Sequence, residues 1–441
     1  MEVHVEYKKL VKPSSPTPSH LRKLKLSFVD QYQPPHYPGI IFYYDGGQGD
    51  VGSVSTKIHR LEESLSETLT IFYPLAGRNG ADGNDFVIDC NDQGVQFVVA
   101  KVNRELGQHL LDDIGSYTDM LLARPAFPTG AAGRSSLPLL AIQVNVFECG
   151  GLAIAVQFNH VLTDMSSICM FLSAWAITNR EGILKAVHPS FDAPSLFPLK
   201  DYSFLPPIWS MENPKLRLKR FVFNGEALSR LRAKITARRN DNEKRPSRVE
   251  LITALISSVL LRIDRAKRGQ LRPLFLVHVV NFRTKTQLSI PENTWGNMFL
   301  DWCSPPTVLP ENESVSELSH TLFDWFREGL MDIIDRLGKV KDPEELRLLV
   351  ATTESGLLEQ VDKGDANLAV MFTSWCNFPV YSIDFGWGPP TLASASKYGL
   401  ELAILMDTKT GDGVEAWMTL EEDNMHQFER DPDILAYASQ S

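Results

Sequence analysis

The chain has 441 residues, of which 43% are hydrophobic and 22% are charged, a globular composition and a length that favours two domains. Its 54 acidic and 44 basic residues give a formal net charge of −10, and no basic stripe stands out, which argues against a nucleic-acid partner. Five scattered cysteines without a Cys-x-x-Cys pair argue against a disulfide framework or a zinc site and favour a reducing compartment.

The sequence shows no sign of membrane attachment. The first residues contain no continuous apolar core of the kind that marks a signal peptide. Apolar runs elsewhere are shorter than a membrane span requires. We therefore expect a cytoplasmic, monomeric protein without a membrane partner.

The first half of the chain alternates between strand and helix patterns. Helical spacing of apolar residues predicts helices over 53–71 and 164–179. Apolar or alternating runs predict strands over 3–10, 39–44, 95–102, 139–147 and 151–159.

A proline-rich stretch then separates two halves. Between about Gly182 and Lys215 the sequence contains six prolines and no periodicity, which is typical of an interdomain linker. The predicted division is an N-terminal domain over 1–185, a crossover linker over 186–215 and a C-terminal domain over 216–441.

Strand and helix signals resume after the linker. Ser247 with Glu250, and Ser314 with Glu317, have the spacing of capping boxes and predict helix starts. Because strands and helices mix without strict alternation, the fold class is mixed α/β. The predicted strands are 218–223, 274–281, 368–372, 401–406 and 413–419.

One histidine has the position of a general base. The spacing His-x-x-x-Asp occurs at His109, His160, His188 and His320, so the spacing alone carries little information. Only His160 follows a strand pattern and precedes a helix start, at Asp164. A rigid scaffold can expose a base in a cleft at such a junction, whereas the other three histidines are interpreted as structural.

A second segment, Asp384-Phe385-Gly386-Trp387-Gly388, is improbable by composition, because tryptophan is scarce in this chain and glycine is disfavoured inside strands. Together with the segment from His160 to Asp164, it resembles the two signature motifs of the BAHD acyltransferases, plant enzymes that use coenzyme A thioesters. The resemblance covers nearly the whole chain and is strongest to the branch containing vinorine synthase and deacetylvindoline acetyltransferase. One departure is Met165, where the family often has glycine or alanine.

The resemblance implies a fold and a donor. It implies two similar-sized mixed α/β domains of chloramphenicol-acetyltransferase-like fold, with a channel at their interface and His160 midway along it. The N-terminal domain would be completed by a crossover segment near 366–388, and the C-terminal domain would form the main coenzyme A side. Acetyl-CoA is the implied cosubstrate, and no metal is implied.

The resemblance also implies residue roles. His160 would be the general base, and Asp164 would be structural, paired with Arg283. Trp387 would donate its indole N–H to the oxyanion, although the alternative is that Asp384, Gly386 and Gly388 form a structural turn outside the active site. Ser247 would contact coenzyme A, although its capping role is sufficient by itself.

Transfer from a thioester to an alcohol needs a proton acceptor, oxyanion stabilisation and a positioned, dry site. The sequence contains no Gly-x-Ser-x-Gly elbow, which argues against a lipase-like hydrolase. We therefore expect direct attack on the thioester by a hydroxyl of a plant alkaloid or terpenoid. The alternatives are a larger acyl donor (benzoyl, hydroxycinnamoyl or branched aliphatic) and a catalytically idle family member that acts as a binding protein.

Overall fold

The computed structural model describes two compact units. Unit 1 comprises Met1–Trp209, Ile290–Asn297 and Phe378–Lys397, and unit 2 comprises Ser210–Ser289, Met298–Asn377 and Tyr398–Ser441. The described residues are 1–33, 36–46, 51–80, 86–123, 137–199, 215–237, 245–308 and 315–440.

The predicted domain bounds stay a prediction, and two segments of these units bear on it. The described part of the predicted linker, up to residue 199, belongs to unit 1, where Ser190 forms a parallel β-bridge with Thr294. The second half of the chain also contributes Phe378–Lys397 to unit 1, which overlaps the predicted crossover segment near 366–388. Proline content alone could not reveal this docking, because it depends on a contact between residues about a hundred positions apart.

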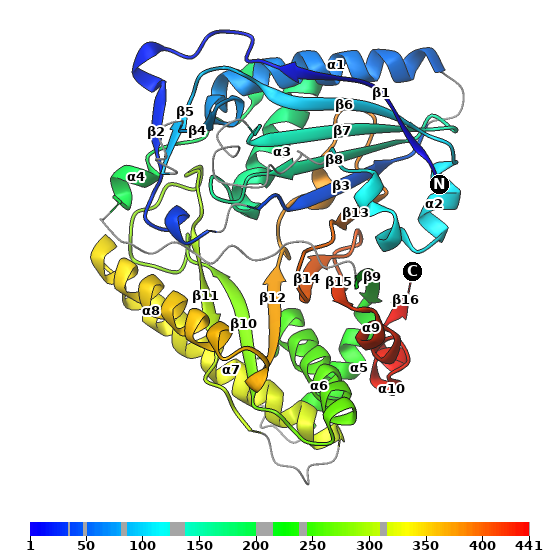
Figure 1. Cartoon of the computed structure of the whole chain (residues 1–441), viewed down its shortest axis with the longest axis vertical. Coiled ribbons are helices and arrows are strands. Elements are labelled where there is room, and N and C mark those ends of the chain that lie inside the picture. The colour runs from blue at the N-terminus through cyan, green and yellow to red at the C-terminus, as the bar shows by residue number, and fades with distance from the viewer. Residues whose placement is uncertain are drawn as a thin grey trace. The chain divides into compact units, whose positions relative to one another are not determined.

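The main sheet of unit 1 has the strand order β1-β6-β7-β8-β3-β13 among the described residues (Figure 1). Its central strands β3 and β8 are buried along their whole length, as their uninterrupted apolar sequences require. β13, from the second half of the chain, pairs antiparallel with β3. The strands of unit 1 are β1 (Val3–Val11), β2 (Lys23–Lys25), β3 (Gly39–Tyr44), β4 (Arg78–Asn79), β5 (Val87–Asp89), β6 (Val95–Val102), β7 (Leu140–Phe147), β8 (Leu152–Phe158) and β13 (Leu392–Ala395).

Two long helices of unit 1, α1 and α3, pack against each other. The buried indole of Trp175 in α3 donates its N–H to the Leu61 carbonyl and to Ser64 Oγ in α1, both at 3.1 Å. α3 ends at Gly182, whose φ of +92° is rarely adopted by L residues. The helices of unit 1 are α1 (Val51–Ile71), α2 (Leu106–Leu111), α3 (Met165–Glu181) and α4 (Ala193–Leu196).

The described strands of unit 2 form a sheet with the order β11-β10-β12-β14-β15-β9-β16, in which β10, β12 and β14 run parallel. The strands are β9 (Leu216–Phe223), β10 (Leu274–Asn281), β11 (Phe299–Cys303), β12 (Leu368–Ser374), β14 (Leu402–Asp407), β15 (Val414–Glu421) and β16 (Ser439–Gln440). The helices are α5 (Gly225–Thr236), α6 (Arg248–Arg268), α7 (Val315–Lys339), α8 (Pro343–Asp362), α9 (Glu422–Phe428) and α10 (Pro432–Tyr437).

The predicted mixed α/β class is confirmed, and most predicted elements lie within two residues of the observed ones. The capping box of Ser247 and Glu250 is present at the start of α6. The corresponding test for Ser314 lies outside the described residues. The sequence did not predict β11 and β13, because strands of five and four residues are too short to show a clear period.

All five cysteines are free thiols. Within the part of the chain that the structure describes, none of the helices combines the length and the apolar character needed to span a bilayer.

Candidate active site

His160 lies in the short turn between β8 and α3, as predicted. β8 ends at Phe158 and α3 begins at Met165. Within the turn, the Asn159 side-chain oxygen accepts the Val161 N–H at 3.0 Å, and the His160 N–H donates to the His36 carbonyl at 3.0 Å. These bonds fix the backbone on both sides of the imidazole.

The turn is held from outside by residues from the second half of the sequence. The Asn297 amide donates to the carbonyls of His160 at 2.9 Å and Val161 at 3.2 Å. The Trp295 indole N–H donates to the Leu162 carbonyl at 2.9 Å. Asn297 therefore braces the His160 turn within unit 1.

Asp30 anchors Asn297 in turn. Its Oδ1 accepts the Asn297 backbone N–H at 2.9 Å and the side-chain amide at 2.8 Å, while its Oδ2 accepts from Ser27. Burial raises the pKa of Asp30 to about 6, and the hydrogen bonds from Asn297 and Ser27 oppose that rise. Sequence reasoning missed Asp30, because nothing local distinguishes it from any other short-loop aspartate.

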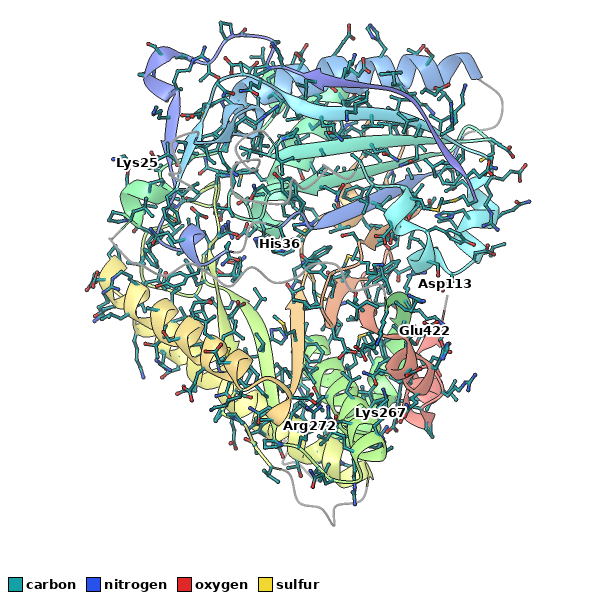
Figure 2. The ribbon with its side chains drawn as sticks, viewed as in Figure 1. Lys25, His36, Asp113, Lys267, Arg272 and Glu422 are labelled. Carbon is teal, nitrogen blue, oxygen red and sulfur yellow. The ribbon has the colours of Figure 1, made fainter. Side chains whose placement is uncertain are left out.

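A second histidine contacts the proposed base directly. The ring of His36, labelled in Figure 2, stacks on the ring of His160 with centroids 4.8 Å apart and an interplanar angle of 26°. Burial lowers the pKa of His160 below 6.5, and the nearby Asp164 carboxylate partly opposes this effect. The His160 imidazole is therefore mostly neutral near pH 7, the form that can accept a proton.

Asp164 caps the helix that follows the turn. It is the N-cap of α3, with its Oδ1 accepting the Ser167 N–H at 2.8 Å, and it is buried. This contact supports a structural role. Arg283 belongs to unit 2, where its backbone N–H donates to Asn281 Oδ1 at 3.0 Å. The pairing of Asp164 with Arg283 stays a prediction.

The 384–388 segment is a tight turn attached to the opposite end of α3. Asp384 Oδ1 accepts the N–H groups of Gly386 at 2.7 Å and Gly388 at 2.9 Å, and both glycines have positive φ, +109° and +98°. Arg180, near the end of α3, donates to the Asp384 carbonyl at 2.7 Å. A Cβ on Gly386 would lie only 3.1 Å from Arg180 Cγ, so glycine is favoured there on two grounds.

Trp387 packs far from His160 within unit 1. Its ring stacks on Phe385 and meets Tyr44 edge-on, with centroids 5.7 and 6.2 Å away. In the pairing of β3 with β8, Gly39 lies opposite Gln157, near His160, whereas Tyr44 lies five residues further along β3. Five strand residues span roughly 17 Å. The geometry therefore supports the structural interpretation of this turn, and no contact among the described residues supports the oxyanion role.

The histidines of two other His-x-x-x-Asp spacings occupy quite different environments. His109 is fully buried in α2, among the rings of Tyr43, Tyr117 and Phe147. Burial lowers its pKa to about 4, which is the behaviour of a neutral core histidine. His188 is exposed in the segment after α3.

Ser247 has a complete structural role at the start of α6. Its Oγ accepts the Glu250 N–H at 3.2 Å, and its own N–H donates to Glu250 Oε2 at 2.6 Å. The neighbouring Arg248 pairs with Asp407 at 2.7 Å and donates to the Gly411 carbonyl at 2.7 Å. Coenzyme A contact by Ser247 stays a prediction. In the described ranges, no group of three or more His, Cys, Asp or Glu side chains could hold a metal ion.

Comparison with known proteins places this geometry in a family. Residues 1–435 match the model of the Transferase family. An acetyl-CoA-benzylalcohol acetyltransferase of Clarkia breweri is 39% identical over the full length of both chains. Vinorine synthase of Rauvolfia serpentina is 35% identical, with 94% of this chain and 93% of that protein covered.

The fold comparison agrees. The crystal structure of vinorine synthase superposes with a TM-score of 0.79 at 31% sequence identity, covering 100% of this chain and 99% of that one. On the whole-chain family match, these relatives and the shared fold, the protein belongs to the Transferase family, the BAHD acyltransferases that use acyl-coenzyme A as donor.

Proposed function

We propose that this enzyme transfers an acetyl group from acetyl-CoA to a hydroxyl of a plant specialised metabolite, with His160 as the general base. The observation that carries the proposal is the position of the partly buried His160 imidazole at a rigid strand-to-helix turn, where burial also lowers its pKa below 6.5. The first relative named above supports transfer to a small organic acceptor, because it is named for acetylation of benzyl alcohol.

In the proposed reaction, His160 takes the proton of the acceptor hydroxyl as its oxygen attacks the thioester carbonyl carbon. The tetrahedral intermediate then collapses, the carbon–sulfur bond breaks, and the imidazolium returns the proton to the leaving thiolate. The bracing of the His160 backbone by Asn297 supports this assignment, because a general base must be held in position during both transfers.

The acceptor class is tested by incubating the purified chain with acetyl-CoA and three kinds of alcohol: benzyl alcohol, a hydroxylated indole alkaloid and a hydroxylated terpenoid. Release of free thiol together with a product heavier by one acetyl group is the expected result for at least one. Parallel runs with benzoyl- and hydroxycinnamoyl-CoA test the larger donors. Binding of acyl-CoA without thiol release for every pair would support the idle family member instead.

The proposed direct attack also fixes the kinetic order, since both substrates must be bound before chemistry occurs. Initial-rate lines against acetyl-CoA at several acceptor concentrations should intersect, and mass spectrometry after donor alone should show an unmodified chain. Parallel lines with a mass gain of one acetyl group would show a covalent intermediate and contradict the proposal. The exposed Cys149 would then be the first residue to examine.

A further inference from the structure

A cavity of about 250 Å³ in unit 2 is used by no step of the proposed reaction. It is bounded by the C-terminal half of α6, the first residues of β12 and β14, the end of β15 and Asn424 in α9.

The cavity arises because β14 begins late. β12 pairs with β10 from Leu368 onward, but its ladder with β14 starts only at Phe372. On the other side, β15 pairs with β9 as far as Glu421, but its ladder with β14 reaches only Leu402, opposite Thr419. A space one strand wide is left between the β12 and β15 edges. Its apolar walls include Leu260, Ile263, Val370, Leu402 and Leu420.

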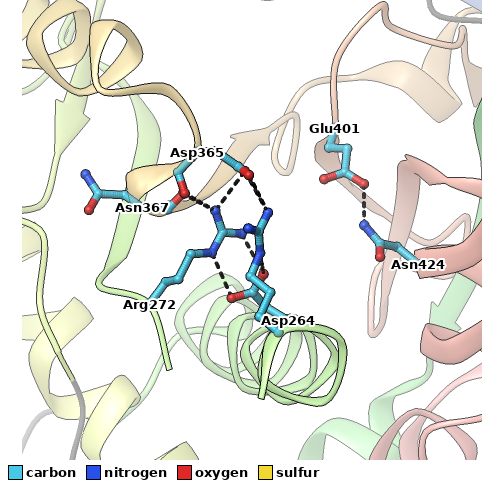
Figure 3. Close-up of polar contacts among 7 residues, drawn as sticks. Asp264, Arg272, Asp365, Asn367, Glu401 and Asn424 are labelled. Carbon is cyan, nitrogen blue, oxygen red and sulfur yellow. Dashed lines mark hydrogen bonds and ion pairs between the residues drawn. The ribbon is translucent and has the colours of Figure 1, made fainter. Parts of the chain in front are cut away.

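The two arginines at one side of this cavity are already engaged. Figure 3 shows Arg272 bonded to Asp264 and to Asp365, and the adjacent Arg268 bonds to the same two carboxylates. Arg272 also donates to the Asn367 carbonyl at 2.9 Å. These two positive and two negative charges balance one another, and the guanidinium groups are held by protein acceptors.

The opposite side of the cavity presents acceptors. Glu401 Oε1 accepts the Glu421 N–H at 2.8 Å and the Asn424 side-chain amide at 3.0 Å, the latter bond drawn in Figure 3. Asn424 Oδ1 is buried and has no hydrogen-bond partner among the described residues. Beyond the balanced arginine cluster, the charged lining residues are Glu401, Glu421 and Lys267, so carboxylates exceed ammonium groups.

We propose that this cavity binds a small organic ammonium ion, with its apolar body between the β12 and β15 edges and its head at the Glu401 carboxylate. An ammonium group has donors and no acceptor, which matches a lining in which both arginines are engaged and the remaining carboxylates outnumber the one lysine. A carboxylate or phosphate ligand would be repelled by the two carboxylates, Glu401 and Glu421, that exceed the one lysine. The volume lies below the usual range of roughly 300–1,000 Å³ for ligand pockets, which favours a compact body.

Calorimetric titration of the full chain with cyclohexylmethylammonium at pH 7, without coenzyme A, tests the proposal. Cyclohexanecarboxylate, of similar shape and opposite charge, should bind far more weakly. Glu401→Gln keeps an acceptor oxygen for its two N–H partners but removes the charge, and it should raise Kd by about tenfold or more. The matched control Glu226→Gln, at an exposed position on α5, should leave Kd unchanged.

A second variant tests the location independently of charge. Ala369 lines the cavity and is exposed, so Ala369→Leu should fold normally and obstruct the ligand's apolar body. Weakened ammonium binding in both Ala369→Leu and Glu401→Gln, with an unchanged melting temperature, supports the site. Absence of binding, equal affinity for the carboxylate, insensitivity to either variant, or loss of binding in His160→Ala would each overturn it.

Discussion

The His160 turn and the 384–388 turn lie at opposite ends of the same helix. α3 has 17 residues, about 25 Å of helix, with Asp164 at its start and Arg180 near its end. The first turn presents an imidazole of lowered pKa on a backbone braced by Asn297. In the second turn, Asp384 accepts the Gly386 and Gly388 N–H groups, and the Phe385 and Trp387 rings stack on each other. Thus the 384–388 motif, which is the less probable of the two by composition, has the geometry of a structural turn.

Replacing His160 with Ala should cause the largest loss of turnover. Without the base, turnover should fall by about 10²–10⁴-fold, while the melting temperature stays close to that of the wild type because the side chain is only partly buried. Steady-state kinetics and calorimetry measure the two effects. His188→Ala, at an exposed histidine, is the matched control. Retention of more than about a tenth of turnover would remove His160 from the mechanism.

Asp384→Ala should lower stability and leave turnover nearly unchanged, which is the reverse of the effect expected for His160→Ala. The variant removes the acceptor of the Gly386 and Gly388 N–H groups, one bond being exposed and the other part-buried, at a cost of about 0.5–1.5 kcal/mol in the free energy of unfolding. Turnover per folded molecule should remain near the wild-type value. Denaturant unfolding and activity of the same samples provide the measurement, with the exposed Glu67→Ala as control. A stable but inactive variant would place this turn in the chemistry.

Two variants separate the capping role of Asp164 from the role of its charge. Asn is as good an N-cap as Asp, so Asp164→Asn should keep the bond to Ser167. Asp164→Ala removes that bond and should lower the free energy of unfolding by about 0.5–2 kcal/mol more. If Arg283 is its partner, a double-mutant cycle of Asp164→Asn with Arg283→Met should show coupling of about 0.5–3 kcal/mol in unfolding free energy. Additive losses would exclude the pair, and a stable, inactive Asp164→Asn would indicate a catalytic carboxylate.

The pH profile tests the lowered pKa at the His160 turn. Because burial holds the folded-state pKa below 6.5, the acidic limb of kcat/KM should have its midpoint below that value. The same shift means that the stabilising contribution of neutral His160 is present above pH 6.5 and is lost as the pH falls. A midpoint above 6.5, measured over several buffers, would show that the imidazole is not desolvated in the working enzyme.

Trp387→Phe should have the smallest effect. Phenylalanine keeps a ring against Phe385 and Tyr44 but removes the indole N–H. With only packing changed, kcat should stay within about a factor of three, whereas loss of an oxyanion donor costs about 10²–10³-fold. A loss of that size in single-turnover measurements, without a change in melting temperature, would reverse the structural interpretation.

Non-local contacts explain why sequence reasoning found only part of the site. His160 was identifiable because an apolar strand, a turn and an N-cap occur within a short stretch of sequence. Asn297 acts on the His160 carbonyl across 137 positions, and Asp30 acts on Asn297 across 267. The stacking of His36 on His160 likewise depends on how β3 and β8 pair. None of these partners carries a local signal.

The sequence by itself determined the mixed α/β class, most strands and helices, the helix start at Asp164 and the position of His160 before it, because periodicity and helix-start signals are short-range properties of the chain. The tertiary structure decided the rest. It placed Phe378–Lys397 in unit 1, separated Trp387 from His160 along β3, and left a cavity where β14 begins late. These features depend on which distant segments pair and in what register, and that choice is made by the packing of the whole sheet.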